Sequence, residues 1–193
     1  MNILNKEKLS HPKTKIKEVF RVEDPETSNS MGEFLVTFLP PAKANELIFL
    51  GIGSDRSTGD SLGPLVGSCL EELCASDIYI LGTLNNPVHA VNLMDRLQFI
   101  KNNFSQPFII AVDSSLGRAK NIGNIKVENG PLVPGIGVNK KLPPAGDIHI
   151  TGTVNVGGFM EYLVLQNTRL GLVMRLAKTI SKGLVLGLQK HFP

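Results

Sequence analysis

The chain has 193 residues, a formal net charge of +3, 42% hydrophobic residues and 19% charged residues. This length and balance are typical of one globular domain with a buried core, and the mild charge does not by itself argue for an acidic partner. No uncharged apolar run approaches the roughly 18 residues of a membrane span, and the chain has no Trp and only two Tyr. We therefore expect neither a membrane protein nor a base-stacking platform for nucleic acid.

Residues 1–44 are expected to form a polar N-terminal arm and a short apolar element. Lysines and acidic residues dominate up to residue 30, which is typical of a solvated segment, and the first residues lack a signal-peptide pattern. The apolar run from Met31 to Leu39 ends at Pro40, because a proline ring interrupts a helix.

From residue 45 onward, short apolar runs alternate with amphipathic segments. Strands are expected at 46–52, 78–81 and 108–112, and helices at 62–74 and from 88 to about 103. Strands and helices that alternate over short connections form right-handed βαβ units. The pattern therefore predicts an α/β domain with a mostly parallel sheet over residues 45–193.

The second half of the chain is less regular. Residues 124–128 alternate in polarity and are expected to form an edge strand or one arm of a hairpin. The glycine- and proline-rich stretch 129–145 is long enough to suggest a functional loop. Further elements are expected as a strand at 147–151 and helices at 159–166 and 172–188.

Two cysteines favour a cytoplasmic location. Cys69 and Cys74 fall on one predicted helix, where a disulfide is not expected, and two thiols without histidine neighbours do not make a zinc site. We expect both to be reduced and buried, as free cysteines usually are.

Two aspartates follow predicted strands and are the candidate catalytic residues. Asp60 lies in a glycine-bracketed loop after the first strand, and Asp113 directly follows the third. The carboxyl ends of such strands can lie close together in a parallel sheet, where ligands usually bind. Two carboxyl groups in one crevice can share a proton and act as general base and general acid on a water molecule. Three alternatives stay open: the pair holds a divalent metal, Asp60 only caps a helix, or Asp113 only occupies a turn.

Other catalytic motifs are absent or incomplete. Gly51 and Gly53 resemble the start of a dinucleotide fingerprint, but Arg56 stands where its third glycine belongs. The chain has no P-loop lysine motif and no Gly-x-Ser-x-Gly elbow. Among the histidines, His149 is the one we consider near the site, whereas His89 is expected to be structural.

Three segments in order resemble the spore germination protease. Residues 51–53 and 58–64 read Gly-Ile-Gly and Thr-Gly-Asp-Ser-Leu-Gly-Pro, similar to that enzyme's Gly-x-Gly and Thr-Pro-Asp-Ala-Leu-Gly-Pro. Residues 109–114 are similar to the apolar strand that carries its second catalytic aspartate, and residues 130–138 to its Gly-x-x-Pro-Gly-x-Gly-Val segment, with one extra residue before the proline. Gly59 replaces the family proline. The chain is much shorter than the protease, and it most resembles the compact, spore-protease-related YyaC family of sporulation proteins, which has this length.

This resemblance, which covers about residues 46–157, implies a three-layer, phosphorylase/hydrolase-like α/β/α fold and an aspartic-type endopeptidase with Asp60 and Asp113 as its pair and no metal. Its substrates would be small acid-soluble spore proteins or another sporulation protein, in the forespore or spore core. The loop 129–145 would shape the substrate groove. The expected substrate-binding residues are Gly53, Ser54, Asp55, Thr58, Ser114, Gly135 and Gly137.

Other functions remain open on the same fold. The chain could be a non-catalytic binding or regulatory protein in sporulation, and a homo-oligomer is compatible with either role. The fold is also that of the hydrogenase-maturation endopeptidases, which bind nickel through two acids and a histidine. In this chain the third ligand would fall near residues 153–155, which read Thr-Val-Asn, with His149 a few residues early. We therefore favour a metal-free site.

Overall fold

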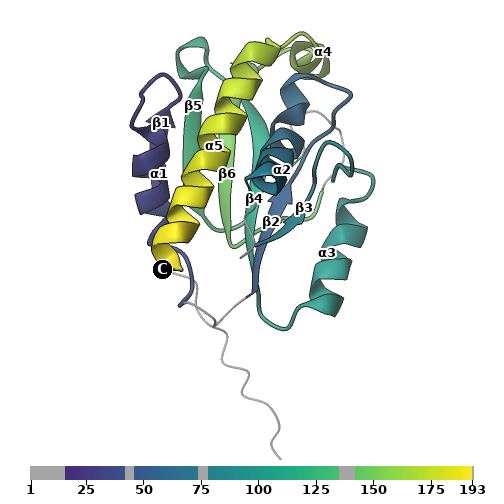
Figure 1. The fold of residues 1–193 in the computed structure, drawn as a ribbon. Helices are drawn as coiled ribbons and strands as arrows, with labels where there is room; N and C mark the ends of the chain where they lie inside the picture. Colours follow the sequence, from purple (N-terminus) through teal and green to yellow (C-terminus); the bar gives the residue numbers. More distant parts are fainter. Residues whose placement is uncertain (1–15, 42–45, 74–77, 135–141, 193) are drawn as a thin grey trace, which may run out of the picture.

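A computed structural model describes residues 16–41, 46–73, 78–134 and 142–192. Figure 1 shows a central sheet with helices packed against it. The strands are β1 (Lys17–Arg21), β2 (Glu46–Gly51), β3 (Tyr79–Leu81), β4 (Pro107–Gly117), β5 (Asn124–Asn129) and β6 (Ile148–Val156). The α-helices are α1 (Thr27–Val36), α2 (Leu62–Glu72), α3 (Leu93–Asn103), α4 (Glu161–Gln166) and α5 (Leu170–His191), and two short 3₁₀ turns are η1 (Gly59–Ser61) and η2 (Ala119–Asn121). No helix in these ranges has the length and apolar character needed to cross a membrane.

The strands form one sheet in the order β1-β5-β6-β4-β2-β3. The four strands β6, β4, β2 and β3 run parallel, whereas β5 is antiparallel to both of its neighbours. This confirms the predicted α/β class with a mostly parallel sheet.

Helices cover both faces of the sheet, which gives three layers. Helices α1, α2 and α5 pack on one face (Figure 1), over a core that includes Leu47 and Phe49 of β2. Helix α3 packs on the other face, against Ile48 and Leu50 of the same strand. Strand β2 is thus buried on both faces, which explains why its sequence is an unbroken apolar run rather than an alternating one.

Strands β2 and β4 flank the point where the chain changes direction across the sheet. From β2 the chain passes through α2 to the edge strand β3, and from β3 it returns through α3 to β4 on the other side of β2. The two connections lie on opposite faces of the sheet. A crevice therefore opens beyond the carboxyl ends of β2 and β4, where open α/β sheets bind ligands.

Several elements differ from the sequence expectations. Residues 17–36, which we expected within the arm and the short apolar element, form β1 on the sheet and α1 against α5. Only Phe20 of β1 is buried, so the strand has too little apolar alternation to be seen in the sequence. Strand β5 lies between β1 and β6 and not at an edge, and it pairs antiparallel with β6, the next strand in the chain, as the predicted alternative of a hairpin arm requires.

Other differences concern where elements begin and end. Helix α3 begins at Leu93, and Val91 and Met94 of the expected apolar face are exposed. The apolar residues of that expected face recur every three residues, a period that does not match the 3.6 residues of an α-helix turn.

Cys69 is half-buried on α2, not fully buried as expected, and Cys74 lies outside the described residues.

Candidate functional site

The glycine loop after β2 places Asp60 beside the end of the sheet. The Ile52 N–H donates to the Val112 carbonyl of β4 over 2.7 Å, and the Gly53 N–H donates to the Val88 carbonyl over 2.8 Å. Gly53 has a φ of +140°, and a Cβ there would overlap the Asp60 carbonyl oxygen. Only glycine therefore allows the loop to fold back so that Asp60, in η1, returns to the strand end.

The start of α2 holds this loop against β4. A Cβ on Gly63 would lie 2.5 Å from the Ile52 nitrogen and 2.8 Å from the Val112 carbonyl oxygen, so the helix backbone touches the ends of both strands. Pro64 follows in the first turn of the helix, where its missing N–H costs no hydrogen bond. Gly63 and Pro64, which follow Asp60 in the sequence, thus allow the start of α2 to pack closely against the strand ends at the site.

Asp113 reaches the same place from β4. The strand continues to Gly117, so Asp113 lies within β4 and not at its tip. Side chains of β4 alternate between the two faces, and Asp113 follows Ile109 and Ala111 toward the face that α3 covers. The Ser114 N–H donates to Asp113 Oδ1 over 2.7 Å, which orients the carboxyl group.

Both aspartates line one pocket, which has a volume of about 260 Å³ and is lined by residues from the loop after β2, from β4, from α4 and from the segments around residues 89, 134 and 142. This volume lies just below the range of about 300–1,000 Å³ that is typical of small-molecule ligand pockets. The lining residues are Ile52, Gly53, Ser54, Arg56, Ser57, Asp60, His89, Ala90, Asp113, Ser114, Ser115, Leu116, Pro134, Leu142, Tyr162 and Leu165.

The electrostatics of the pocket couple the two carboxyl groups. Burial raises the pKa of Asp113 well above its usual range, the negative charge of Asp60 raises it further, and the bond from the Ser114 N–H lowers it. Burial also raises the pKa of Asp60, whereas a hydrogen bond from the Ser54 backbone and the charge of His89 lower it. The pair therefore retains a proton to higher pH than two isolated aspartates would.

The structure places the expected substrate-binding residues in three groups. Gly53, Ser54 and Ser114 line the pocket together with the two aspartates. Asp55 is exposed and Thr58 is half-buried, and neither lines the pocket. Gly135 and Gly137 lie outside the described residues.

His89 is the residue that sequence reasoning placed outside the site. It lines the pocket, its charge lowers the pKa of Asp60, and its Nδ1 lies 3.3 Å from the Val91 nitrogen. The isolated bridge between Ile52 and Val88 carries His89 to this position. That bridge joins segments far apart in the sequence, and no local pattern signals it.

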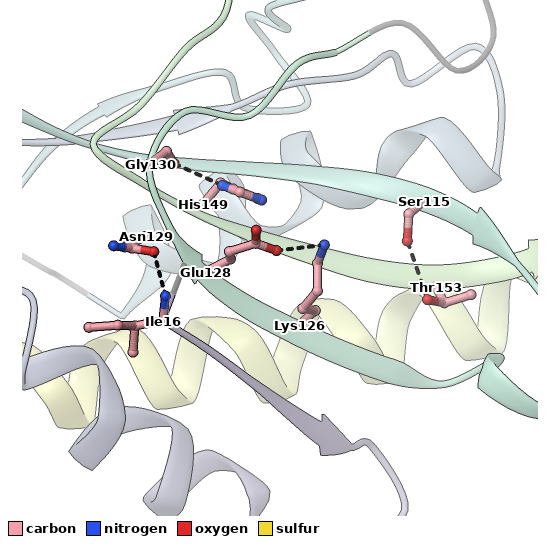
Figure 2. Close-up of polar contacts among 8 residues, drawn as sticks. All are labelled: Ile16, Ser115, Lys126, Glu128, Asn129, Gly130, His149 and Thr153. Atoms are coloured by element: carbon pink, nitrogen blue, oxygen red, sulfur yellow. Dashed lines mark hydrogen bonds and ion pairs between the residues drawn. The ribbon is translucent and has the colours of Figure 1, made fainter. Parts of the chain in front are cut away.

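His149, the histidine that we considered instead, does not line the pocket. Figure 2 shows it on β6 pointing to Gly130, and the distance from its Nδ1 to the Gly130 carbonyl oxygen is 2.9 Å. It belongs to a polar stretch of the sheet face that also holds the 2.9 Å Lys126–Glu128 ion pair and the 3.3 Å contact between the Ser115 and Thr153 hydroxyls.

Asp60, Asp113 and His89 line the same pocket, but these three described side chains are not grouped as a metal site. Within the described ranges, no three acid, histidine or cysteine side chains are grouped so that they could hold a metal ion. Asn155, at the position expected for the third ligand, uses its Nδ2 on the Val164 carbonyl and the Thr168 hydroxyl, and its Oδ1 accepts the Val156 N–H. Its amide ties β6 to the α4 region and is not directed to a metal.

Comparisons with known proteins relate the whole domain to one family. The model of a family described as "Protein of unknown function (DUF1256)" matches residues 19–183. A relative from Bacillus subtilis (strain 168), "Uncharacterized protein YyaC", is 46% identical over 172 residues, which are 89% of this chain and 84% of the relative. The crystal structure of the NiFe hydrogenase maturation protease HycI from Thermococcus kodakarensis KOD1 is similar over 78% of this chain and 98% of that chain, with a TM-score of 0.48 and 18% identity.

Proposed function

This chain belongs to the DUF1256 family, and we propose that it is an endopeptidase that hydrolyses peptide bonds with Asp60 and Asp113. The observation that carries the proposal is that the two carboxyl groups, which come from separate segments of the chain, share one pocket, where burial and the charge of Asp60 raise the pKa of Asp113. Such a pair supplies both an acid and a base at one place, which is what hydrolysis by an activated water requires.

The surroundings of each aspartate suggest different roles. Asp113 has the more strongly raised pKa and is the carboxyl group that keeps the proton, so it acts as general acid toward the leaving amine. Burial raises the pKa of Asp60 as well, but the Ser54 backbone bond and the charge of His89 offset part of that rise, so Asp60 ionises before Asp113 and acts as general base on the water. The backbone N–H groups of the loop 51–59 lie near the position of the scissile carbonyl in this proposal.

The choice of peptide bonds as substrate rests on sequence. The segments at 51–64 and 109–114 resemble the two aspartate segments of the spore germination protease. By this resemblance we propose a role in sporulation or germination, with small acid-soluble spore proteins or another sporulation protein as substrate.

The test is a cleavage assay with purified small acid-soluble spore protein, read by mass spectrometry of the fragments. General acid–base catalysis contributes about 10²–10⁴-fold to rates, so Asp60→Asn and Asp113→Asn should each lower kcat by that order. Asp95→Asn is the control, because Asp95 is an exposed aspartate of α3 outside the pocket. Wild-type rates in both site variants would contradict the pair mechanism. Capture of the spore protein without cleavage would favour the binding-protein alternative.

A further inference from the structure

Strand β4 extends beyond its neighbour β2 and leaves one of its edges open at the pocket. On one side, β4 pairs with β6 from Ile110 to Gly117, with a register shift between Ser115, which pairs with Thr153, and Leu116, which pairs with Asn155. On the other side, its pairing with β2 ends at Val112. Within the described part of the chain, residues 113–117 therefore have a strand partner on one side only.

The backbone groups that face the open side follow from the alternation of the strand. The Val112 carbonyl accepts the Ile52 N–H on the β2 side, and the Gly117 carbonyl accepts the Gly157 N–H on the β6 side. Because successive residues direct their N–H and C=O groups to opposite edges, Ser114 and Leu116 face the open edge. The Ser114 N–H is used by Asp113. This leaves the Ser114 carbonyl and both backbone groups of Leu116 for a further strand.

The pocket lies along this edge. Residues 113–116 of β4 line it, and Ser54, Arg56 and Ser57 contribute from the loop after β2. The Ser57 hydroxyl is buried and has no hydrogen-bond partner in the described structure. A buried hydroxyl without a partner is costly, and a bound ligand with a polar group would satisfy it.

Beyond the edge, the chain exposes large apolar side chains around α4. Tyr162 lines the pocket and is 60% exposed. Its exposed apolar neighbours in the sequence are Val156, Phe159, Met160 and Leu163. Clustered exposed apolar residues next to a pocket are typical of a binding surface.

We propose that the open edge of β4 at Ser114 and Leu116 binds a polypeptide segment as an added β-strand, with apolar side chains of that segment packed against the α4 region. This deepens the proposed function and rests on it, because the added strand would pass directly beside Asp60 and Asp113. Backbone hydrogen bonds provide affinity in this mode, and the pockets for alternate side chains provide specificity. The substrate is then an unfolded or extended segment that is rich in apolar residues.

The test uses a binding assay that does not depend on cleavage. The probe is a short fluorescein-labelled peptide of alternating leucine and serine with terminal lysines, and binding to the Asp113→Asn protein is followed by fluorescence anisotropy. Leu116→Pro removes the N–H that faces the open edge and leaves the pairing with β6 intact. This variant should bind the peptide about tenfold more weakly, because one backbone hydrogen bond is lost and the proline ring blocks the approach of the added strand. Leu116→Ala is the matched control, because it shortens the same side chain and keeps the N–H.

A second set of peptides tests the strand geometry directly. Each peptide carries a single N-methylated backbone amide at a different position. Methylation at one set of alternate positions should abolish binding, whereas methylation at the positions between them should leave binding intact. Absence of this alternation, or equal affinity of Leu116→Pro and Leu116→Ala, would overturn the inference, as would failure of the probe to bind at all. Circular dichroism and thermal unfolding of each variant establish that it is folded. If binding is lost at alternate methylated positions but the wild-type protein cleaves nothing, the result would support strand addition at β4 and contradict the endopeptidase proposal. If the protein cleaves its substrate but binding does not alternate with the methylated position, the result would support the endopeptidase proposal and contradict strand addition.

Discussion

Asp60 raises the pKa of Asp113 although the two residues come from different segments of the chain. Asp60 lies in the turn after β2, Asp113 lies within β4, and both line the pocket at the point where the connections of the sheet change direction. Burial provides the larger part of the raised pKa, and the charge of Asp60 adds to it. This relationship leads to predictions about stability and about activity.

The first prediction concerns stability and pH. Because the folded-state pKa of Asp113 is raised, the folded protein holds its proton more tightly than the unfolded chain does. The free energy of unfolding should therefore fall as the pH rises from the unfolded-state pKa of about 3.9 through the folded-state pKa. Asp113→Asn, which carries no charge, should be more stable than wild type at neutral pH by about 1–2 kcal/mol, the range of typical stabilising substitutions. Urea unfolding at neutral and acidic pH measures both values, and the difference should vanish below the unfolded-state pKa. A destabilised variant at neutral pH would contradict this account.

The second prediction concerns His89 and the pH dependence of cleavage. The charge of His89 lowers the pKa of Asp60, so its removal raises that pKa and shifts the acid limb of the kcat/KM profile of His89→Gln to higher pH. Lys101→Gln removes an exposed positive charge from α3 outside the pocket and should leave the acid limb in place. An unshifted acid limb in His89→Gln would show that His89 does not act on the general base.

The third prediction concerns the glycine that shapes the Asp60 loop. Gly53→Ala forces a Cβ into the Asp60 carbonyl at a φ of +140° and should lower the free energy of unfolding by about 1–3 kcal/mol, the cost of one strained backbone position. Because the strain moves Asp60, the cleavage rate should fall by more than the loss of folded protein accounts for. Gly171→Ala in α5 is the control: a Cβ there has nothing within 4 Å, and alanine favours a helix. Equal thermal unfolding of the two variants would disprove the steric argument.

The fourth prediction concerns metal ions. Among the described residues, no three acid, histidine or cysteine side chains around Asp60 and Asp113 are grouped so that they could hold a metal ion, and Asn155 is held by Val164 and Thr168. Dialysis against a chelator should therefore leave the cleavage rate unchanged, and added nickel or zinc should not raise it. Loss of activity on dialysis with recovery on nickel would instead support the metal-dependent alternative. Metal content before and after dialysis, measured by mass spectrometry, completes the comparison.

Much of the central fold is readable from local sequence patterns. The runs at β2 and β4 and the apolar face of α2 are long and regular, and the structure places elements there. Strand β1 was missed because only one of its residues is buried, and its place in the sheet comes from pairing with β5. The first five residues of the helix that we expected from Val88 lie in an irregular segment, because the bridge between Ile52 and Val88 holds that segment at the end of the sheet.

The sequence by itself determined the order of strands and helices from β2 onward and selected two aspartates that lie next to apolar runs. These features depend on periodicities of two and 3.6 residues and on the residues next to them, which are local properties. Only the tertiary structure decided that His89 and Tyr162 share the pocket, that His149 does not line it, and that β4 continues past Asp113. Each of these depends on contacts between distant segments. The polar residues 113–115 extend β4 because β6 pairs with them, and no local apolar pattern marks that extension.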